Sequence, residues 1–70
     1  NIPYLYDRVN INSGKKQKFG TQLVLDKNNK LIPKPLLSYK KVNSYRKEYG
    51  LEPLEEYLEY ANRLYSQNGK

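Results

Sequence analysis

The chain has 70 residues, enough for one small domain, and contains neither cysteine nor histidine. This composition excludes disulfides, Cys/His metal sites and catalysis by histidine or cysteine. The net charge is +6, split between +9 in residues 1–47 and −3 in residues 48–70. No apolar run approaches the roughly 20 residues of a membrane span. We therefore expect a soluble chain with no membrane partner, and the composition does not distinguish a cytoplasmic from a secreted protein.

The first segment, NIPYLYDRVNIN, combines a proline with an apolar stretch. Its apolar residues fit one side of a short helix, and they also fit an extended segment. We favour a helical turn around residues 4–9, followed by a turn at Asn12-Ser13-Gly14.

A β-hairpin is predicted for about residues 18–34. Residues 21–25 alternate in the manner of a strand, and the polar, asparagine-rich run 26–30 is typical of a turn. Leu31 and Ile32 begin a second strand. Pro33 and Pro35 cannot donate ladder hydrogen bonds, so this second strand should lie at an edge and end early.

Two helices are predicted, at about 39–49 and 53–66. Ser38 is a suitable N-cap for the first. Gly50 is placed as the left-handed residue that ends it, with Leu51 as its apolar neighbour, and Pro53 suits the first turn of the next helix. Together with the hairpin, these helices predict an α+β fold.

Three stretches resemble motifs of a bacterial family described as domain of unknown function 6624. The first is Tyr4-Leu5-x-Asp7-Arg8-Val9, and the second runs from Gly14-Lys15-x-Gln17 to Phe19-Gly20-Thr21-Gln22. The third joins Val42, Asn43 and Arg46 to Gly50, Leu51, Pro53, Leu54, Glu56 and Tyr57. Their order and spacing match the family over residues 4–58.

The resemblance implies that family members have a further helical segment upstream of the first motif. Residues 1–70 are accordingly expected to form either a single small domain or the C-terminal part of a larger one. This chain also differs from the family at Leu37-Ser38, where family members often have Asp-Pro. The family supplies no activity, so it assigns no mechanism.

One candidate functional cluster consists of Asp7, Arg8, Thr21 and Gln22. An aspartate beside an arginine suits acid–base or anion chemistry, although adjacent helical side chains do not face each other, and the structural interpretation (capping and pairing) is favoured. Gly20-Thr21 after lysines invites a phosphate-loop interpretation, but a P-loop requires G-x-x-x-x-G-K-[ST] opening a helix. No cofactor is expected, no residue is assigned as catalytic, and whether the chain is an enzyme stays open.

A second candidate surface is basic. Six cations in the first two thirds of the chain could bind anions or nucleic acid, with aromatic rings nearby for stacking on bases. They are Lys15, Lys16, Lys18, Lys40, Lys41 and Arg46. The alternative interpretation is an ordinary solvated surface.

The leading functional hypothesis is a non-catalytic interaction module. A chain this short buries only about 60% of the surface its unfolded form exposes, so we expect a protein partner or an upstream segment of its own domain to cover the rest. The alternative is an RNA-binding module, or a histidine-free ribonuclease-type toxin domain. A third hypothesis makes the complete family domain an enzyme that uses Asp7, Arg8, Thr21 and Gln22.

Overall fold

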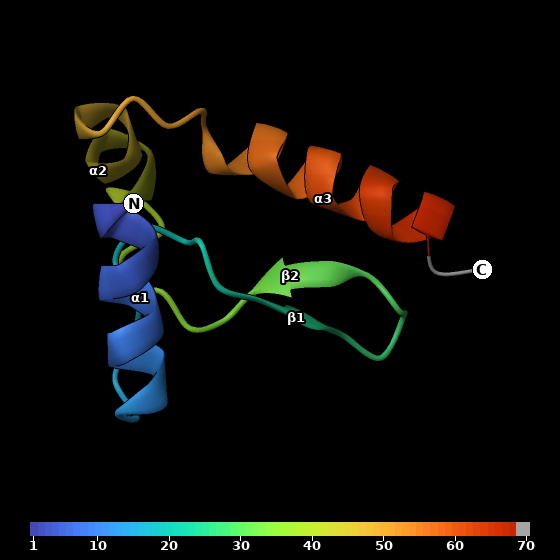
Figure 1. The fold of residues 1–70 in the computed structure, drawn as a ribbon, viewed down its shortest axis with the longest axis horizontal. Coiled ribbons are helices and arrows are strands. Elements are labelled where there is room, and N and C mark those ends of the chain that lie inside the picture. The colour runs from blue at the N-terminus through green and yellow to red at the C-terminus, as the bar shows by residue number, and fades with distance from the viewer. Residues whose placement is uncertain (69–70) are drawn as a thin grey trace.

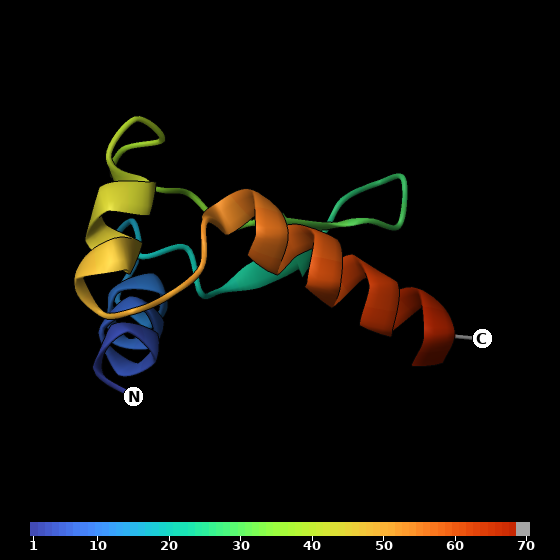
Figure 2. The ribbon, with the colours of Figure 1, turned by 90° about the horizontal axis from the view of Figure 1, so that it is seen from above.

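The computed structural model describes residues 1–68 and confirms the α+β fold (Figure 1). The order of elements is α1 (Ile2–Asn12), β1 (Leu23–Leu25), β2 (Leu31–Pro33), α2 (Val42–Glu48) and α3 (Leu54–Asn68). Figure 1 shows α1 and α2 together at one end of the molecule, with α3 and the hairpin extending from them. In the view from above, α3 lies over the hairpin (Figure 2).

Helix α1 is longer than the predicted turn at residues 4–9, because both of its ends are capped. The Asn1 side chain accepts a hydrogen bond from the Tyr4 amide at 2.8 Å, and a proline lies in the first turn. At the other end, the amide of Lys15 donates to the Asn10 carbonyl at 2.7 Å. These caps satisfy backbone groups that a shorter helix would leave unpaired.

The hairpin forms where it was predicted, but its strands have only three residues each. The antiparallel register pairs Leu23 with Pro33, Val24 with Ile32 and Leu25 with Leu31. The turn is stabilised by Asp26, whose side chain accepts from the amides of Asn28 and Lys30 at 2.8 and 2.9 Å. Residues 18–22, predicted to begin the first strand, are irregular because side chains take up their backbone hydrogen bonds, as described below.

Helix α2 starts at residue 42 and not at residue 39. Ser38 does accept from a backbone amide, that of Lys41 at 3.1 Å, but the residues between them form a turn. The predicted helix end at Gly50 is confirmed: its φ is +72°, its amide donates to Lys47, and the Leu51 amide donates to the Arg46 carbonyl at 2.9 Å. This pair of bonds is the Schellman motif.

The apolar core is small. Leu36, Val42 and Leu54 form its buried cluster, with Tyr57 and Leu58 packed against it. Gly20 approaches this cluster so closely that a Cβ atom there would lie 3.0 Å from Leu54 Cδ1. Within residues 1–68, no helix is both long and apolar enough to cross a membrane.

Candidate functional site

The largest fully buried side chains are polar: Arg46, Gln17 and Asp7. With Thr21, which is largely buried, they form what we call the buried polar cluster. Gln17 and Thr21 belong to the irregular segment 17–22, and Asp7 and Arg46 form hydrogen bonds to it. The cluster therefore determines the path of the chain between α1 and β1.

Asp7 lies on the inner face of α1 and has no solvent exposure. Its Oδ1 accepts from the amides of Lys18 and Phe19 at 2.8 and 3.0 Å. Its Oδ2 accepts from the Thr21 amide at 3.0 Å and from the Thr21 hydroxyl at 2.9 Å. Backbone N–H groups converging on one carboxylate supply the compensation that a buried charge requires.

Gln17 is also fully buried, and its side-chain amide links the residue that precedes β1 to the residue that follows β2. Its Nε2 donates to the carbonyls of Gln22 and Lys34, at 3.0 and 2.7 Å, and its Oε1 accepts from the Gln22 amide at 2.9 Å. Its backbone adds bonds to Pro35 and Leu37. The side chain thus replaces a ladder partner that a regular strand would have supplied.

Arg46 reaches the same segment from α2. Its Nη1 donates to the Phe19 carbonyl at 2.7 Å, and its Nε donates to the Glu52 carbonyl at 2.6 Å. Its guanidinium also lies 4.8 Å from the centre of the Tyr57 ring. Burial lowers the pKa of Arg46, although the nearby Glu52 carboxylate opposes this shift and the group remains a cation at neutral pH.

Tyr57, on α3, completes the contacts to segment 17–22. Its hydroxyl donates to the Thr21 carbonyl at 3.1 Å. Burial raises the pKa of Tyr57, against the opposing effect of the Arg46 cation. Helices α1, α2 and α3 are therefore all joined to one six-residue segment by side-chain hydrogen bonds.

Three of the four residues of the predicted cluster come together: Asp7, Thr21 and Gln22. The Gln22 amide group donates to the Thr21 hydroxyl at 3.2 Å. Arg8 is exposed and makes no hydrogen bond or ion pair within residues 1–68. Both oxygens of the Asp7 carboxylate are occupied by donors from segment 17–22, and the side chain has no exposed surface.

The structure separates Arg46 from the other predicted basic residues. Lys15, Lys16, Lys40 and Lys41 are exposed, whereas Arg46 points inward and is bonded to the backbone. Lys18 is half-buried, with its Nζ 4.6 Å from the centre of the Tyr45 ring and 5.3 Å from that of Phe19. The exposed lysines are therefore the ones available to an anion.

Gln17 was not among the predicted site residues. Between two lysines it has the appearance of a solvated glutamine, and its three side-chain bonds depend on contacts with residues 22 and 34. Its presence in the second motif is the one signal that could have identified it. Among residues 1–68, no group of three or more Asp or Glu side chains is placed to hold a metal ion.

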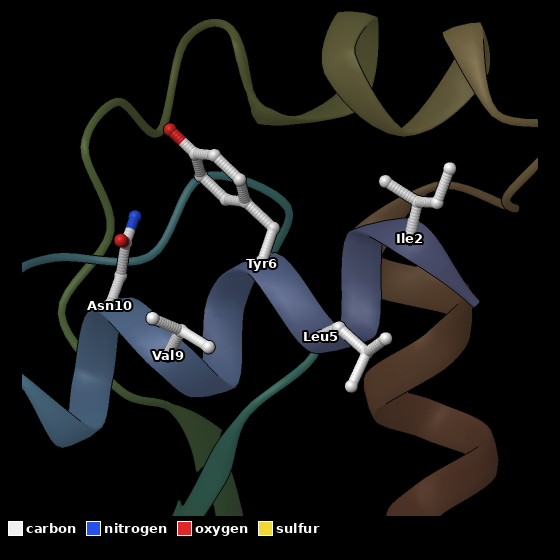
Figure 3. Close-up of a pocket in the computed structure, with 5 residues that line it drawn as sticks. All are labelled: Ile2, Leu5, Tyr6, Val9 and Asn10. Atoms are coloured by element: carbon white, nitrogen blue, oxygen red, sulfur yellow. The ribbon is translucent and has the colours of Figure 1, made fainter.

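A different surface of the same helix is apolar and exposed. Ile2, Leu5, Tyr6 and Val9 follow helical spacing along α1 and are 65, 51, 46 and 60% exposed. Together with Asn10 they line a shallow pocket of about 410 Å³ (Figure 3). We call this surface the α1 apolar face. In contrast, the buried side of α1 presents Pro3 and the charged Asp7.

Comparison with known proteins gives a family and no nearer relative. Neither a search of curated proteins nor a search of solved structures returns a significant match. One family model, described as a family of unknown function (DUF6624), matches residues 1–70. The buried polar cluster and the segment it holds fall within that match. The chain belongs to the family of unknown function DUF6624.

Proposed function

We propose that this chain is a non-catalytic interaction module that docks on polypeptide through the α1 apolar face. The occupant is either a protein partner or an upstream segment of the same domain. The observation that supports the proposal is the inverted character of α1, which buries an aspartate and exposes its apolar stripe. An amphipathic helix in an isolated domain normally has the opposite arrangement.

The energetics favour docking at this face. Fully burying a large apolar side chain is worth about 1.5–3 kcal/mol. Because the four stripe residues are each about half exposed, covering them would contribute on the order of 1 kcal/mol apiece. The pocket in Figure 3 offers a partner side chain a place to insert among them. A contiguous apolar surface of this kind is typical of an interaction site.

Site-specific photo-crosslinking tests the proposal and identifies the occupant. A photoreactive amino acid is placed at Val9, on the stripe, and at Arg8, its exposed neighbour on another side of α1, in the protein made by its own host. We expect a discrete crosslinked polypeptide from position 9 and not from position 8. Mass spectrometry of the product then distinguishes another protein from an upstream segment. Equal crosslinking at the two positions, or none at either, would refute the proposal.

A second candidate function, nucleic-acid binding, is favoured by the loop before α2. Tyr39 is 70% exposed and is followed by two exposed lysines, Lys40 and Lys41. An aromatic ring beside cations is a common element of single-strand binding, because bases stack on the ring while the cations contact phosphates. None of the lysines in residues 1–68 forms an ion pair within the chain.

Binding to a mixed RNA pool across a salt series tests this second candidate. Neutralising several phosphates should give a log–log slope of affinity against salt of about −0.7 for each contact with single strands. Tyr39→Ala should weaken binding by roughly 1–3 kcal/mol if the ring stacks on a base. Tyr4→Ala, which removes an exposed tyrosine from α1, is the matched control. Absence of binding at low salt would reject RNA as a ligand.

A further inference from the structure

The two edges of the hairpin differ in how their backbone groups are satisfied. In an antiparallel pair, alternate residues turn their N–H and C=O groups away from the partner strand. The bonds from Asp26 to Lys30 and from Lys34 to Gln22 assign the outward positions to Leu31 and Pro33 on β2, and to Leu23 and Leu25 on β1.

The outer edge of β2 is closed. Asn62, on α3, accepts from the Leu31 amide at 2.7 Å and donates to the Leu31 carbonyl at 3.0 Å, as a neighbouring strand would. The other outward residue, Pro33, has no N–H to offer. Figure 1 shows β2 lying between α3 and β1, so no further strand can pair on this side.

The outer edge of β1 is open. Within residues 1–68, the outward amides and carbonyls of Leu23 and Leu25 have no hydrogen-bond partner. The strand contains no proline, and its Val24 and Leu25 side chains are 43 and 41% exposed. An exposed, apolar edge with unpaired backbone groups is a template for one more strand.

We propose that the β1 edge binds an extended, acidic polypeptide segment by strand addition. The paired region of the hairpin, residues 22–34, has three lysines, Lys27, Lys30 and Lys34, and one acid, Asp26, whose carboxylate is occupied by the turn. None of these lysines is ion-paired within residues 1–68. An acidic segment would neutralise them, while its backbone would satisfy Leu23 and Leu25.

Electrostatic repulsion disfavours a second copy of the chain as the occupant. Two chains of net charge +6, joined edge to edge, would bring two sets of hairpin lysines together. A third strand from an acidic partner has no such repulsion, and three strands form a far more stable sheet than two. This site is separate from the α1 apolar face, so either proposal can fail without the other.

The test uses two synthetic peptides, EVTVTVE and its basic twin KVTVTVK, with the 70-residue chain labelled with ¹⁵N. We expect the acidic peptide to slow hydrogen exchange at the Leu23 and Leu25 amides and to shift their resonances more than those of α1. The basic twin should bind about fivefold more weakly or worse, as two lost exposed charge pairs imply. Equal binding by the twins, or shifts confined to other elements, would overturn the proposal.

Two variants separate backbone pairing from side-chain contact. Leu25→Pro removes an outward amide and leaves the hydrogen bonds between β1 and β2 intact, so it should abolish the protection that the acidic peptide gives. Leu25→Ala keeps the amide and should retain peptide-induced protection. If the proline variant does not fold, acidic peptides N-methylated on alternate residues serve instead: methylation of one set of amides should abolish binding and methylation of the other should not. If methylation of neither set abolishes binding, strand addition is refuted. Protection that rises with protein concentration, without peptide, would identify a second copy.

Discussion

Replacing Asp7 with asparagine should remove most of the stability of the chain. The carboxylate offers two acceptor oxygens to three backbone amides and one hydroxyl. Asparagine offers one oxygen, and its NH₂ group would face N–H donors in a site that water does not reach. Losing two charge-assisted bonds and leaving donors unsatisfied costs about 3–5 kcal/mol. The total free energy of unfolding of a 70-residue domain is roughly 4–10 kcal/mol.

Urea unfolding, followed by far-ultraviolet circular dichroism and tyrosine fluorescence, measures this loss. The midpoint should fall steeply, or the variant should be largely unfolded without urea. Arg8→Gln, one residue away and exposed, should change the free energy of unfolding by less than about 0.5 kcal/mol. Asp26→Asn, in an exposed turn with two amides bound, should cost about 1 kcal/mol. A cost below about 1 kcal/mol for the Asp7 variant would refute the importance assigned to the cluster.

Three further predictions concern neighbouring positions. Gly20→Ala should lower the free energy of unfolding by about 2–3 kcal/mol, because φ is +70° and the new Cβ would crowd Leu54. Gly14→Ala, with φ +79° and open space, should lower it by about 1 kcal/mol in the same urea assay. Arg46→Lys should cost about 2–4 kcal/mol in thermal melts, since an ammonium cannot reproduce the guanidinium fork; full stability would contradict the assigned bonds. Tyr57→Phe should cost about 1 kcal/mol at pH 7. Because the pKa of Tyr57 is raised in the fold, its contribution is complete below about pH 10 and is lost as pH rises through the raised pKa. The difference between wild type and this variant should therefore shrink in alkaline solution, and a constant difference would argue against the burial effect.

The elements that could be predicted from sequence are those governed by local chemistry. Gly50 and Leu51 end α2 through bonds to residues three and five positions away, and the turn at Asp26 depends on amides two and four residues away. Pro33 correctly indicated a second strand that ends early. These positions depend on backbone preferences that a short stretch of sequence displays.

The candidate site was predicted only in part, because its contacts are long-range. Asp7 bonds to residues 11–14 positions away, and Arg46 bonds to Phe19, 27 positions away. The residues around Asp7 mark it as a candidate but do not show that its side chain is buried, and Arg46 lies among lysines that do face solvent. The first strand was predicted too long for the same reason, since side chains distant in sequence replace its ladder.

The buried polar cluster has a consequence for how stability varies with temperature. Exposing apolar surface on unfolding raises the heat capacity, whereas exposing polar groups lowers it. A molecule whose largest fully buried side chains are an arginine, a glutamine and an aspartate should therefore show a small heat-capacity increment for its size. Its stability curve should be unusually flat, so that cooling weakens this fold less than it weakens domains held by aliphatic cores.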